Sequence, residues 1–273
     1  MPTPARPLLL VGGGKMGEAL LAGWLGRGLE RRAALVVEPD PARREALAAS
    51  LGVGTAAGPD GLPADLRPGA LVVAVKPQTM EEALPPYRSY LLPDTLVLSI
   101  AAGKPLALLE RLLGERLGIV RAMPNTPAAI GRGVSVLCAN AAAMPEQRAL
   151  AERLMAAVGS TDWIDDESLM HAVTAVSGSG PAYVFHLIEA LAAAGRAVGL
   201  APDLAMRLAR GTVAGAGELA GRSPESASEL RVNVTSPGGT TAAALAVLMG
   251  EGGLEALLTR AVAAAAQRSR ELA

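Results

Sequence analysis

Two stretches in the C-terminal part of the chain combine hydroxyl side chains with glycines just before a helical pattern. They are Ser177–Pro181, which reads Ser-Gly-Ser-Gly-Pro, and Asn233–Thr241, which reads Asn-Val-Thr-Ser-Pro-Gly-Gly-Thr-Thr. The first N–H groups of a helix are unpaired and lie at the positive end of its dipole, so they can bind a carboxylate. Either stretch alone is more often a helix cap. If the chain also binds a dinucleotide, as the glycine-rich turn described next indicates, the pair together favours a site for a small anion.

A glycine-rich turn near the N-terminus has the composition of a dinucleotide-binding loop. It fits G-x-G-x-x-G, follows a short apolar run directly and opens a helical pattern. Glycines allow the tight turn and the close approach of a pyrophosphate, which the N–H groups of the helix start bind. A purely structural turn is the alternative. The predicted cofactor-binding residues of this loop are Gly12, Gly13, Gly14, Lys15, Met16 and Gly17.

An acidic residue at the end of the second predicted strand bears on the choice of cofactor. Glu38 lies about 20 positions after Gly17, where a carboxylate accepts hydrogen bonds from the adenosine ribose. It would repel the 2′-phosphate of NADP. Arg43 and Arg44 could neutralise that phosphate, although a solvated helix face is the more ordinary role for each. The sequence therefore predicts NADPH or NADH as cofactor, with a slight preference for NADH.

Two segments rich in small residues follow later apolar runs. Ligands of open α/β sheets bind at the carboxyl ends of strands, and small residues there let a flat nicotinamide approach the backbone. Each segment could instead be a simple strand-to-helix turn. Combined with the glycine loop, they predict further cofactor-binding residues: Ala74, Val75, Lys76, Pro77, Ile100, Ala101 and Ala102.

Candidate acid–base groups are scarce. His171 lies in a helical pattern near Glu167, and His186 lies among apolar residues, where a packed or interfacial role is favoured over catalysis. No lysine follows Lys104, and no spacing of His and Cys suggests a metal. Oxidation of an alcohol needs a group that takes the hydroxyl proton. A cyclic imine can arrive protonated and needs only hydride and orientation, so the sequence favours reduction of a C=N bond.

The elements that must position these residues fall into two domains. Up to about residue 160, short apolar runs alternate with amphipathic patterns, which predicts an α/β fold with a mostly parallel sheet covered on both faces. We expect a Rossmann-type domain over residues 1–163 and an all-helical domain over residues 164–273. The predicted strands are Leu8–Val11, Leu35–Val37, Leu71–Val75, Leu96–Ile100, Ile119–Ala122 and Val134–Cys138, with helical patterns such as Glu18–Leu25 and Pro41–Leu51 between several of them.

Punctuation residues predict the helices of the second domain. A long pattern begins at Pro181 and ends near Gly199, and the next begins at Pro202. Ser223-Pro224 resembles an N-cap followed by a first helical proline. Later helices are expected to start at Thr240 or Thr241 and after Gly252-Gly253, the last running to about Glu271. Alanine-rich faces on these helices are too extensive for one small bundle to bury, which predicts a homodimer.

The composition indicates which class of ligand the protein binds and in which cellular compartment it is expected. The chain has 25 basic and 26 acidic residues and no basic run, which argues against nucleic acid or a membrane surface and favours a small-molecule substrate. The apolar run Leu8–Val11 is too short for a signal-peptide core or a membrane span, so we expect a cytoplasmic protein. Cys138 is expected to be a buried small hydrophobic residue and not a nucleophile.

At these motifs the sequence closely resembles the pyrroline-5-carboxylate reductases, over almost its whole length. Segment Gly54–Pro68 is rich in Gly, Pro and Ala and does not match motif by motif. The resemblance is carried by Gly12–Gly17, Ala74–Pro77, Ala101–Gly103, Arg121–Pro127, Ala172–Thr174, Ser177–Tyr183 and Asn233–Thr241.

The resemblance implies an enzyme that reduces 1-pyrroline-5-carboxylate to L-proline with NAD(P)H and that consists of a Rossmann domain followed by a helical dimerisation domain, with five dimers often assembling into a decamer. It also implies that the backbone around Gly238, Gly239 and Thr240 holds the substrate carboxylate, while Thr241 hydrogen-bonds the ring nitrogen as the catalytic residue. Asn233 and Ser236 would border the nicotinamide and the substrate, and Glu167 would contact the substrate region. Glu38 departs from the small or hydroxyl residues that many relatives carry for NADPH.

Two other functions remain open from the sequence. One is a 3-hydroxyacid dehydrogenase with a similar plan, although such enzymes use a catalytic lysine and none follows Lys104. The other is a non-catalytic nucleotide sensor or dimeric interaction module, in which the glycine turns are only structural.

Overall fold

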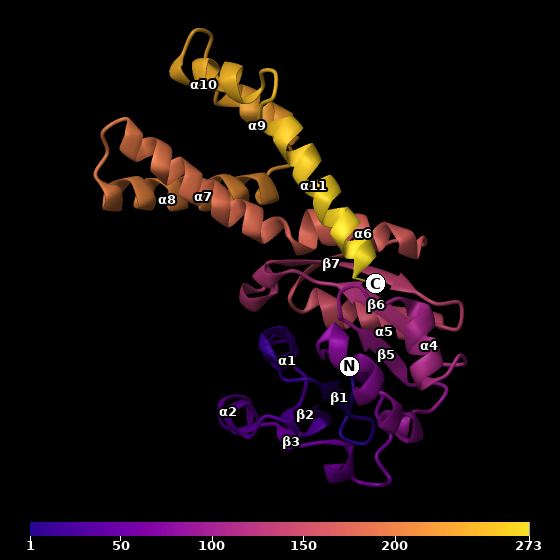
Figure 1. The fold of residues 1–273 in the computed structure, drawn as a ribbon. Coiled ribbons are helices and arrows are strands. Elements are labelled where there is room, and N and C mark those ends of the chain that lie inside the picture. Colours follow the sequence, from indigo (N-terminus) through magenta and orange to yellow (C-terminus); the bar gives the residue numbers. More distant parts are fainter. Residues whose placement is uncertain (273) are drawn as a thin grey trace. The chain divides into compact units, whose positions relative to one another are not determined.

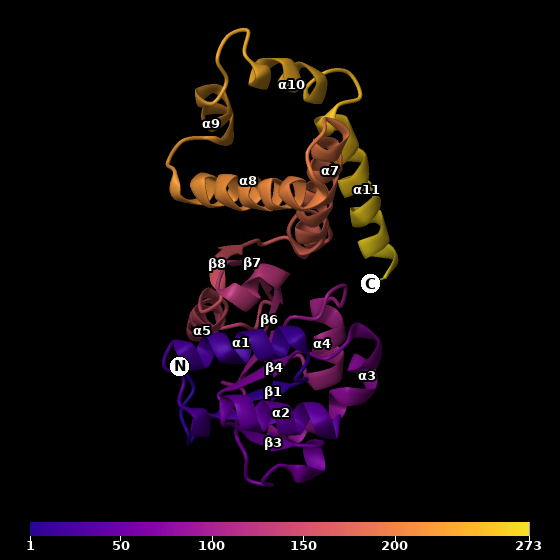
Figure 2. The same cartoon turned by 90° about the vertical axis from the view of Figure 1, so that its left-hand side faces the viewer.

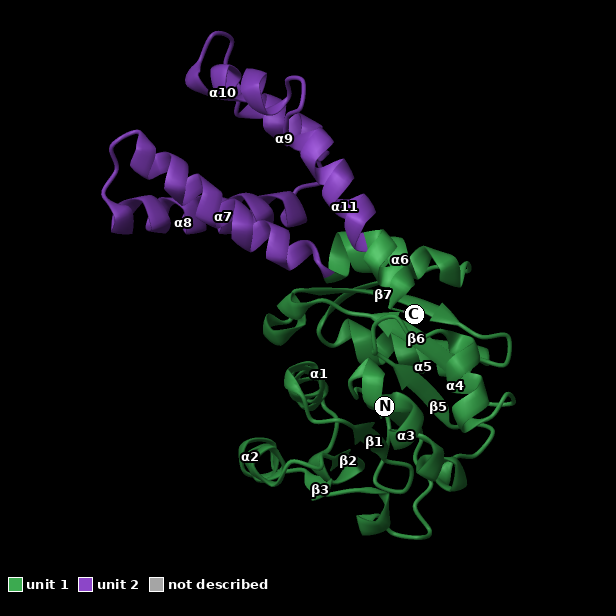
Figure 3. Cartoon of the chain, viewed as in Figure 1, with its two compact units in different colours: residues 1–178, 266–273 green, residues 179–265 purple. Residues whose placement is uncertain are grey.

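In a computed structural model that describes residues 1–272, the chain forms two compact units (Figure 3). Unit 1 comprises Met1–Gly178 together with the end of the chain from Ala266, and unit 2 comprises Ser179–Ala265. The expected boundary after residue 163 coincides with the end of the last strand. Unit 1 continues beyond that point because Met170 is fully buried in its core.

Unit 1 is built on an eight-stranded sheet of order β3-β2-β1-β4-β5-β6-β7-β8 (Figure 1). All neighbouring strands pair in parallel except β6 and β7, which are antiparallel, so the predicted mostly parallel sheet is confirmed. All six predicted strands are confirmed; β3 and β8 were not predicted. The strands are β1 Leu8–Val11, β2 Ala34–Val37, β3 Gly54–Ala56, β4 Ala70–Val73, β5 Leu96–Ser99, β6 Gly118–Met123, β7 Gly133–Ala139 and β8 Gly159–Trp163.

Two buried clusters show that helices cover both faces of this sheet. On one face, alternate residues of β1 such as Leu8 and Leu10 pack with α1, α2 and α5. On the other face, Leu9 and Val11 pack with α3, the 3₁₀ turn η4 and α4. Continuous burial of β1, β4 and β5 follows from this double covering. The bounds are α1 Lys15–Gly26, α2 Pro41–Leu51, α3 Met80–Ala83, η4 Pro85–Tyr90, α4 Leu106–Leu113 and α5 Pro145–Ala156.

Unit 1 ends in a short helical run that leads toward unit 2. It consists of the 3₁₀ turn η6 Glu167–Leu169, α6 Met170–Val173 and the π-helical turn η7 Thr174–Gly178. The hydroxyl of Thr174 donates to the Met170 carbonyl at 2.8 Å, which suits a helical and not an extended backbone. The hydroxyl- and glycine-rich stretch before Pro181 is therefore helical up to Gly178.

Unit 2 is helical throughout, as predicted. Helices α7 and α8 pack against each other at an angle (Figures 1 and 2). The cap expected at Ser223-Pro224 is wrong: α9 is capped by Ser226, whose hydroxyl accepts the Glu229 N–H at 3.2 Å while the Glu229 carboxylate accepts the Ser226 N–H at 2.7 Å. The helices are α7 Gly180–Ala197, α8 Pro202–Arg222, α9 Ala227–Asn233, α10 Thr240–Leu248 and α11 Leu254–Glu271, which ends in unit 1.

Large apolar side chains of unit 2 are exposed in the single chain. Helix α7 alone exposes Val184, Phe185, Leu187 and Leu191, and Phe185 is 60% exposed. Among the helices described, none combines the length and apolar content that a bilayer crossing requires.

Candidate functional site

The glycine loop lies between the carboxyl end of β1 and the start of α1, as predicted. Gly12 has a φ of +101°, and a Cβ there would lie 2.6 Å from the carbonyl oxygen of Ala74. A Cβ on Gly17 would collide with the Gly12 carbonyl, whereas one on Gly14 would meet no atom. Glycine is thus required at Gly12 and Gly17 by close backbone packing, and the surface at Gly14 is open for a ligand.

The start of α1 is free to bind an anion. Gly14 occupies the cap position in an extended conformation, and no side chain caps the helix. The first N–H groups of α1, including those of Lys15 and Met16, therefore have neither a side-chain acceptor nor a preceding turn to bond to. A phosphate fits this arrangement of donors, which supports the predicted pyrophosphate site.

Glu38 is held beneath this loop by backbone donors. Its side chain is 8% exposed, its Oε2 accepts the Gly13 N–H at 2.8 Å and its Oε1 accepts the Asp40 N–H at 3.0 Å. A carboxylate has about four acceptor positions, so these two bonds leave room for ribose hydroxyls. Glu38 is therefore fixed in place at the end of β2, where the adenosine ribose was expected.

Arg43 and Arg44 are not simply solvated residues of a helix face, and that expectation is wrong. Arg43 donates to the Gly13 carbonyl from Nε at 3.1 Å and from Nη2 at 2.7 Å. Arg44 Nη1 donates to the carbonyls of Glu38 at 2.8 Å and Pro39 at 3.1 Å. Arg43 thus stabilises the backbone of the glycine loop, and Arg44 stabilises the turn between β2 and α2.

The two small-residue segments lie at the same edge of the sheet as the glycine loop. Val11 pairs with Val73 and Val73 with Ser99, so the residues that follow these strands emerge side by side. The Ala74 N–H donates to the Val11 carbonyl at 2.8 Å and the Ile100 N–H to the Val73 carbonyl at 3.0 Å. The predicted cofactor residues Ala74–Pro77 and Ile100–Ala102 are thus brought together with Gly12–Gly17 within unit 1.

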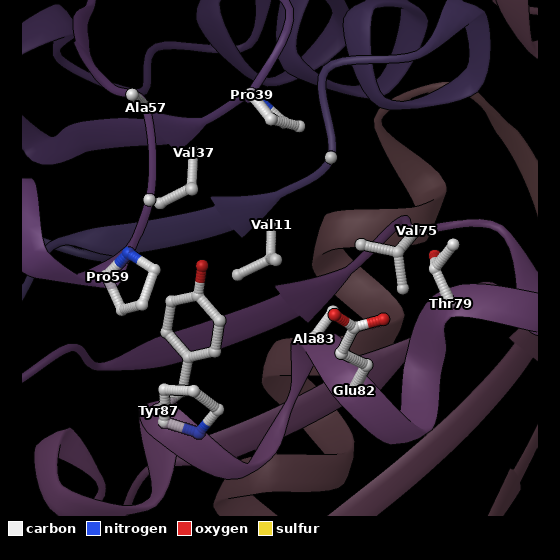
Figure 4. A pocket seen from close by; sticks show the side chains of 13 residues that line it. Val11, Val37, Pro39, Ala57, Pro59, Val75, Thr79, Glu82, Ala83 and Tyr87 are labelled. Atoms are coloured by element: carbon white, nitrogen blue, oxygen red, sulfur yellow. The ribbon is translucent and has the colours of Figure 1, made fainter.

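A cavity of about 360 Å³ opens at this edge, between the ends of β1, β2, β3 and β4 (Figure 4). Its walls are mainly apolar, and its polar side chains are Thr79, Glu82 and Tyr87. Sequence reasoning found only Gly12 and Val75 among its lining residues. The other lining residues follow strand ends or belong to α3 and η4. The rule that ligands bind at the carboxyl ends of strands could have predicted those that follow strands. The full lining is Val11, Gly12, Val37, Pro39, Ala57, Gly58, Pro59, Val75, Thr79, Glu82, Ala83, Pro86 and Tyr87.

Glu167 lies in unit 1 and already has protein partners. Its Oε1 accepts the Leu106 N–H at the start of α4 and Nη1 of Arg121, both at 2.8 Å. The Arg121 side chain is 4% exposed, so this ion pair supplies the charge partner that a buried guanidinium needs. Glu167 thereby ties η6 to β6 and α4, a role that its sequence context did not reveal.

The remaining titratable groups of this region do not form an acid–base pair. His171 Nδ1 lies 3.0 Å from the Ser269 hydroxyl, and burial lowers the pKa of His171. Cys138 is 1% exposed, as expected, and burial raises the pKa of its thiol. Among residues 1–272, no three His, Cys, Asp or Glu side chains come together as metal ligands.

The second of the two hydroxyl-rich stretches has the predicted structure. In unit 2, Gly238 has a φ of +68°, Gly239 occupies the cap position of α10, and the helix begins at Thr240. No side chain caps α10, so its first N–H groups are available to a carboxylate. Asn233 ends α9, where its Nδ2 donates to Glu225 at 3.0 Å.

The first stretch differs from its prediction. Ser177 and Gly178 lie in the π-helical turn η7, and Asn125 Nδ2 donates to the carbonyl and the hydroxyl of Ser177, each at 3.3 Å. The Ser179 carbonyl accepts the Ala182 N–H at 3.0 Å. Because helical backbone precedes α7, its start is not a free helix N-terminus, and only the stretch before α10 keeps that role.

Two protein families match different parts of the chain. Residues 167–272 match the family of pyrroline-5-carboxylate reductase dimerisation regions, and residues 8–103 match the family of coenzyme F420-dependent NADP oxidoreductases. The chain is 40% identical over 273 residues to the pyrroline-5-carboxylate reductase of Pseudomonas aeruginosa, covering 100% of this chain and 98% of the relative.

Solved structures show the same similarity. A pyrroline-5-carboxylate reductase from Coxiella burnetii superposes with a TM-score of 0.92 at 35% identity, over 98% of this chain and 99% of that one. A Plasmodium falciparum pyrroline carboxylate reductase with NADP bound has a TM-score of 0.82 at 29% identity, over 98% of each chain.

Proposed function

The chain belongs to the pyrroline-5-carboxylate reductase family, and we propose which of its residues carry out the reaction of that family. The protein is an NAD(P)H-dependent oxidoreductase that reduces 1-pyrroline-5-carboxylate to L-proline. When bound, NAD(P)H supplies a hydride, which together with one proton converts the C=N bond of the substrate into the C–H and N–H bonds of proline. The protein must therefore hold the nicotinamide ring next to the imine carbon and orient the ring nitrogen of the substrate.

The cofactor would be held by the edge of unit 1 at which the glycine loop lies. The first N–H groups of α1 would bind the pyrophosphate, and the open surface at Gly14 leaves space for it. Two segments rich in small residues would lie against the remainder of the dinucleotide, because they follow β4 and β5 at the same edge of the sheet. They are Ala74–Pro77 and Ile100–Ala102. The free start of α1 is the single observation on which this assignment most depends.

NADH is the cofactor that the geometry of Glu38 favours. A 2′-phosphate on the ribose would face a carboxylate that two backbone N–H groups fix in place. Arg43 and Arg44 already donate to backbone carbonyls, so compensation of that phosphate would require them to leave those acceptors. We therefore propose that the enzyme accepts both cofactors and is more efficient with NADH.

The substrate would be held where α10 begins. The backbone at Gly238, Gly239 and Thr240 would bind the carboxylate through the first N–H groups of the helix. Thr241 would donate its hydroxyl hydrogen bond to, or accept one from, the ring nitrogen and so orient the imine carbon. Asn233 and Ser236 precede this helix start and would border the nicotinamide and the substrate.

Glu167 has a more restricted role than its motif alone suggests. Because Oε1 is bonded to Arg121 and Leu106, any contact with the substrate region falls to Oε2. We propose that Glu167 serves first to hold η6 in place and that Oε2 provides the contact implied by the resemblance.

The protein forms homo-oligomers, as the match to the dimerisation family indicates. We propose that five dimers assemble into a decamer in the cytoplasm, supported by the apolar surface that unit 2 exposes. Light scattering on the purified protein tests this, because a decamer contains ten copies of a 27.6 kDa chain. A dimer mass at micromolar concentration would exclude the decamer.

The direct test of function follows the absorbance of NADH and NADPH with 1-pyrroline-5-carboxylate. We expect substrate-dependent oxidation of both, with a higher kcat/KM for NADH. Hydroxyacids offered with NAD⁺ are the control, because a 3-hydroxyacid dehydrogenase would reduce NAD⁺ with them and leave the imine unchanged. No substrate-dependent oxidation would favour a nucleotide sensor.

A further inference from the structure

Tyr87 places a hydroxyl inside the cavity at the ends of β1 to β4. Its side chain is 2% exposed and packs in the core on the α3 and α4 side of the sheet. Figure 4 shows the phenol ring rising from η4, with its oxygen directed into the cavity among Val11, Val37 and Pro59. The polar end of an otherwise buried ring thus forms part of the cavity floor.

The hydroxyl of Tyr87 has no hydrogen-bond partner within residues 1–272, and this sets it apart from its neighbour Tyr90. Tyr90, in the same turn, donates its hydroxyl to the Pro59 carbonyl at 3.1 Å. The Tyr87 oxygen is not among the fully buried atoms that lack a partner, so the cavity leaves it accessible to solvent or to a ligand. Burial raises the pKa of Tyr87 to about 12, so at neutral pH the group keeps its proton and can both donate and accept.

The position of the cavity indicates its occupant. Gly12 of the glycine loop lines one end, and Val37 and Pro39 beside the fixed Glu38 line another. A dinucleotide with its pyrophosphate at the start of α1 and its ribose near Glu38 would have its adenosine half here. A mainly apolar cavity of about 360 Å³ with a few polar groups suits a purine nucleoside.

We propose that the Tyr87 hydroxyl hydrogen-bonds the adenosine half of the nicotinamide cofactor and is a cofactor-binding residue of this enzyme. The inference rests on the proposed function, because it takes the cofactor to be NADH or NADPH. It assigns to Tyr87 a role in affinity for the dinucleotide, with no part in hydride transfer.

The test compares the full-length protein with Tyr87→Phe, which removes only the hydroxyl. The probe is ADP-ribose, which contains the adenosine and pyrophosphate but no nicotinamide, and its Kd is measured by calorimetry. Loss of one hydrogen bond between neutral groups predicts a Kd raised about five-fold. The Tm without ligand should be nearly unchanged, because the hydroxyl that is removed faces the cavity and has no protein partner, while the rise in Tm on adding ADP-ribose should shrink.

Tyr90→Phe is the matched control. It removes a hydroxyl that donates to a protein carbonyl, so its Tm without ligand should fall and its Kd for ADP-ribose should stay within about two-fold of the unmodified protein. An equal loss of affinity in both variants would overturn the proposal. So would a Tyr87→Phe variant that loses stability and binds ADP-ribose normally, because Tyr87 would then be only a core residue.

Steady-state kinetics provide a second readout. Tyr87→Phe should raise the KM for NADH about five-fold and leave both kcat and the KM for 1-pyrroline-5-carboxylate unchanged. With reduced nicotinamide mononucleotide, which lacks adenosine, the variant and the unmodified protein should have equal rates. A difference with that cofactor would overturn the assignment. If neither protein oxidised NADH, the proposed function would fail while the binding comparison would still decide the role of Tyr87.

Discussion

The edge of unit 1 around Gly12–Gly17 and the α9–α10 junction of unit 2 differ in how completely one chain builds them. In unit 1, Glu38 is 8% exposed and fixed by two N–H donors, and Arg43 stabilises the loop through Gly13. In unit 2, Asn233, Ser236 and Thr240 are exposed, and α10 buries none of its residues. The proposed cofactor region is thus preorganised within a single chain, and the proposed substrate region is not.

Binding of the cofactor therefore depends on the fold of one chain, and binding of the substrate depends on the assembly. A preorganised region binds its ligand without waiting for further ordering, because the cost of fixing its side chains is already met on folding. An exposed helix start in water binds a carboxylate weakly, since water competes for its N–H groups. We therefore expect cofactor binding to survive loss of assembly and substrate turnover to require it.

The largest expected effect comes from breaking the assembly. Phe185→Glu places a charge on the exposed apolar face of α7, where burial against a second copy would leave it unpaired. Light scattering should show monomers, and kcat/KM for 1-pyrroline-5-carboxylate should fall on the order of 100-fold. ADP-ribose affinity should stay within about two-fold.

Ala149→Glu is the control for that variant, because it adds the same charge at an exposed position of α5 in unit 1. It should leave both assembly and turnover unchanged. A monomeric Phe185→Glu protein with full activity would show that one chain alone completes the substrate region, contrary to our expectation.

The next effect is local to the start of α10. Thr241→Ala should lower kcat about 10- to 100-fold, because a hydrogen bond to the reacting nitrogen is lost, and should change the KM for NADH by less than about two-fold. Thr241→Ser keeps the hydroxyl and should retain most of the rate. Equal rates for Thr241→Ala and the unmodified enzyme would remove Thr241 from the catalytic role.

A smaller effect is expected on cofactor choice. Glu38→Ser removes the fixed carboxylate, so the ratio of kcat/KM for NADPH to that for NADH should rise about ten-fold. Glu45→Ser removes the same charge from an exposed position on α2 and should leave the ratio unchanged. If Glu38→Ser also left the ratio unchanged, Glu38 would play no part in the discrimination.

The smallest effect concerns Glu167, which separates structural support from ligand contact. Glu167→Ala leaves Arg121 buried without its partner, and we expect a loss of about 1–3 kcal/mol in the free energy of unfolding, measured by urea denaturation. At a temperature where the variant stays folded, kcat should fall no more than about three-fold. A large loss of turnover with unchanged stability would show that substrate contact is the main role of Glu167.

Strands buried on both faces were predictable from the sequence because such strands are continuously apolar. Leu8–Val11 is an example, and its four residues are all buried. Strand β8 at the sheet edge was missed because Gly159–Trp163 reads Gly-Ser-Thr-Asp-Trp, which contains no apolar run, and is only partly buried. Strand β3 has three residues, too few for any periodicity to be seen.

Local capping signals were partly misread. Ser226 and Glu229 have the S-x-x-E spacing of a capping box, so the sequence contained the true start of α9. The prediction had instead placed the cap at Ser223-Pro224. The π-helical turn at Thr174–Gly178 could not be predicted, because glycine and serine there favour a loop and only its contacts in unit 1 make it helical.

The site shows the same division. The glycine loop and the α10 start were found because their residue types follow from backbone geometry. The roles of Arg43 and Arg121 depend on contacts between residues far apart in the sequence, since Arg43 donates to the Gly13 carbonyl and Arg121 to the Glu167 carboxylate. No local pattern carries that information.

A crystal structure of the protein with NADH and L-proline would show where both ligands bind. We predict the pyrophosphate at the first turn of α1 and the proline carboxylate on the N–H groups at the start of α10, with the ring nitrogen within hydrogen-bonding distance of the Thr241 hydroxyl. Proline bound away from α10, or a dinucleotide bound away from the Gly12–Gly17 loop, would contradict the account.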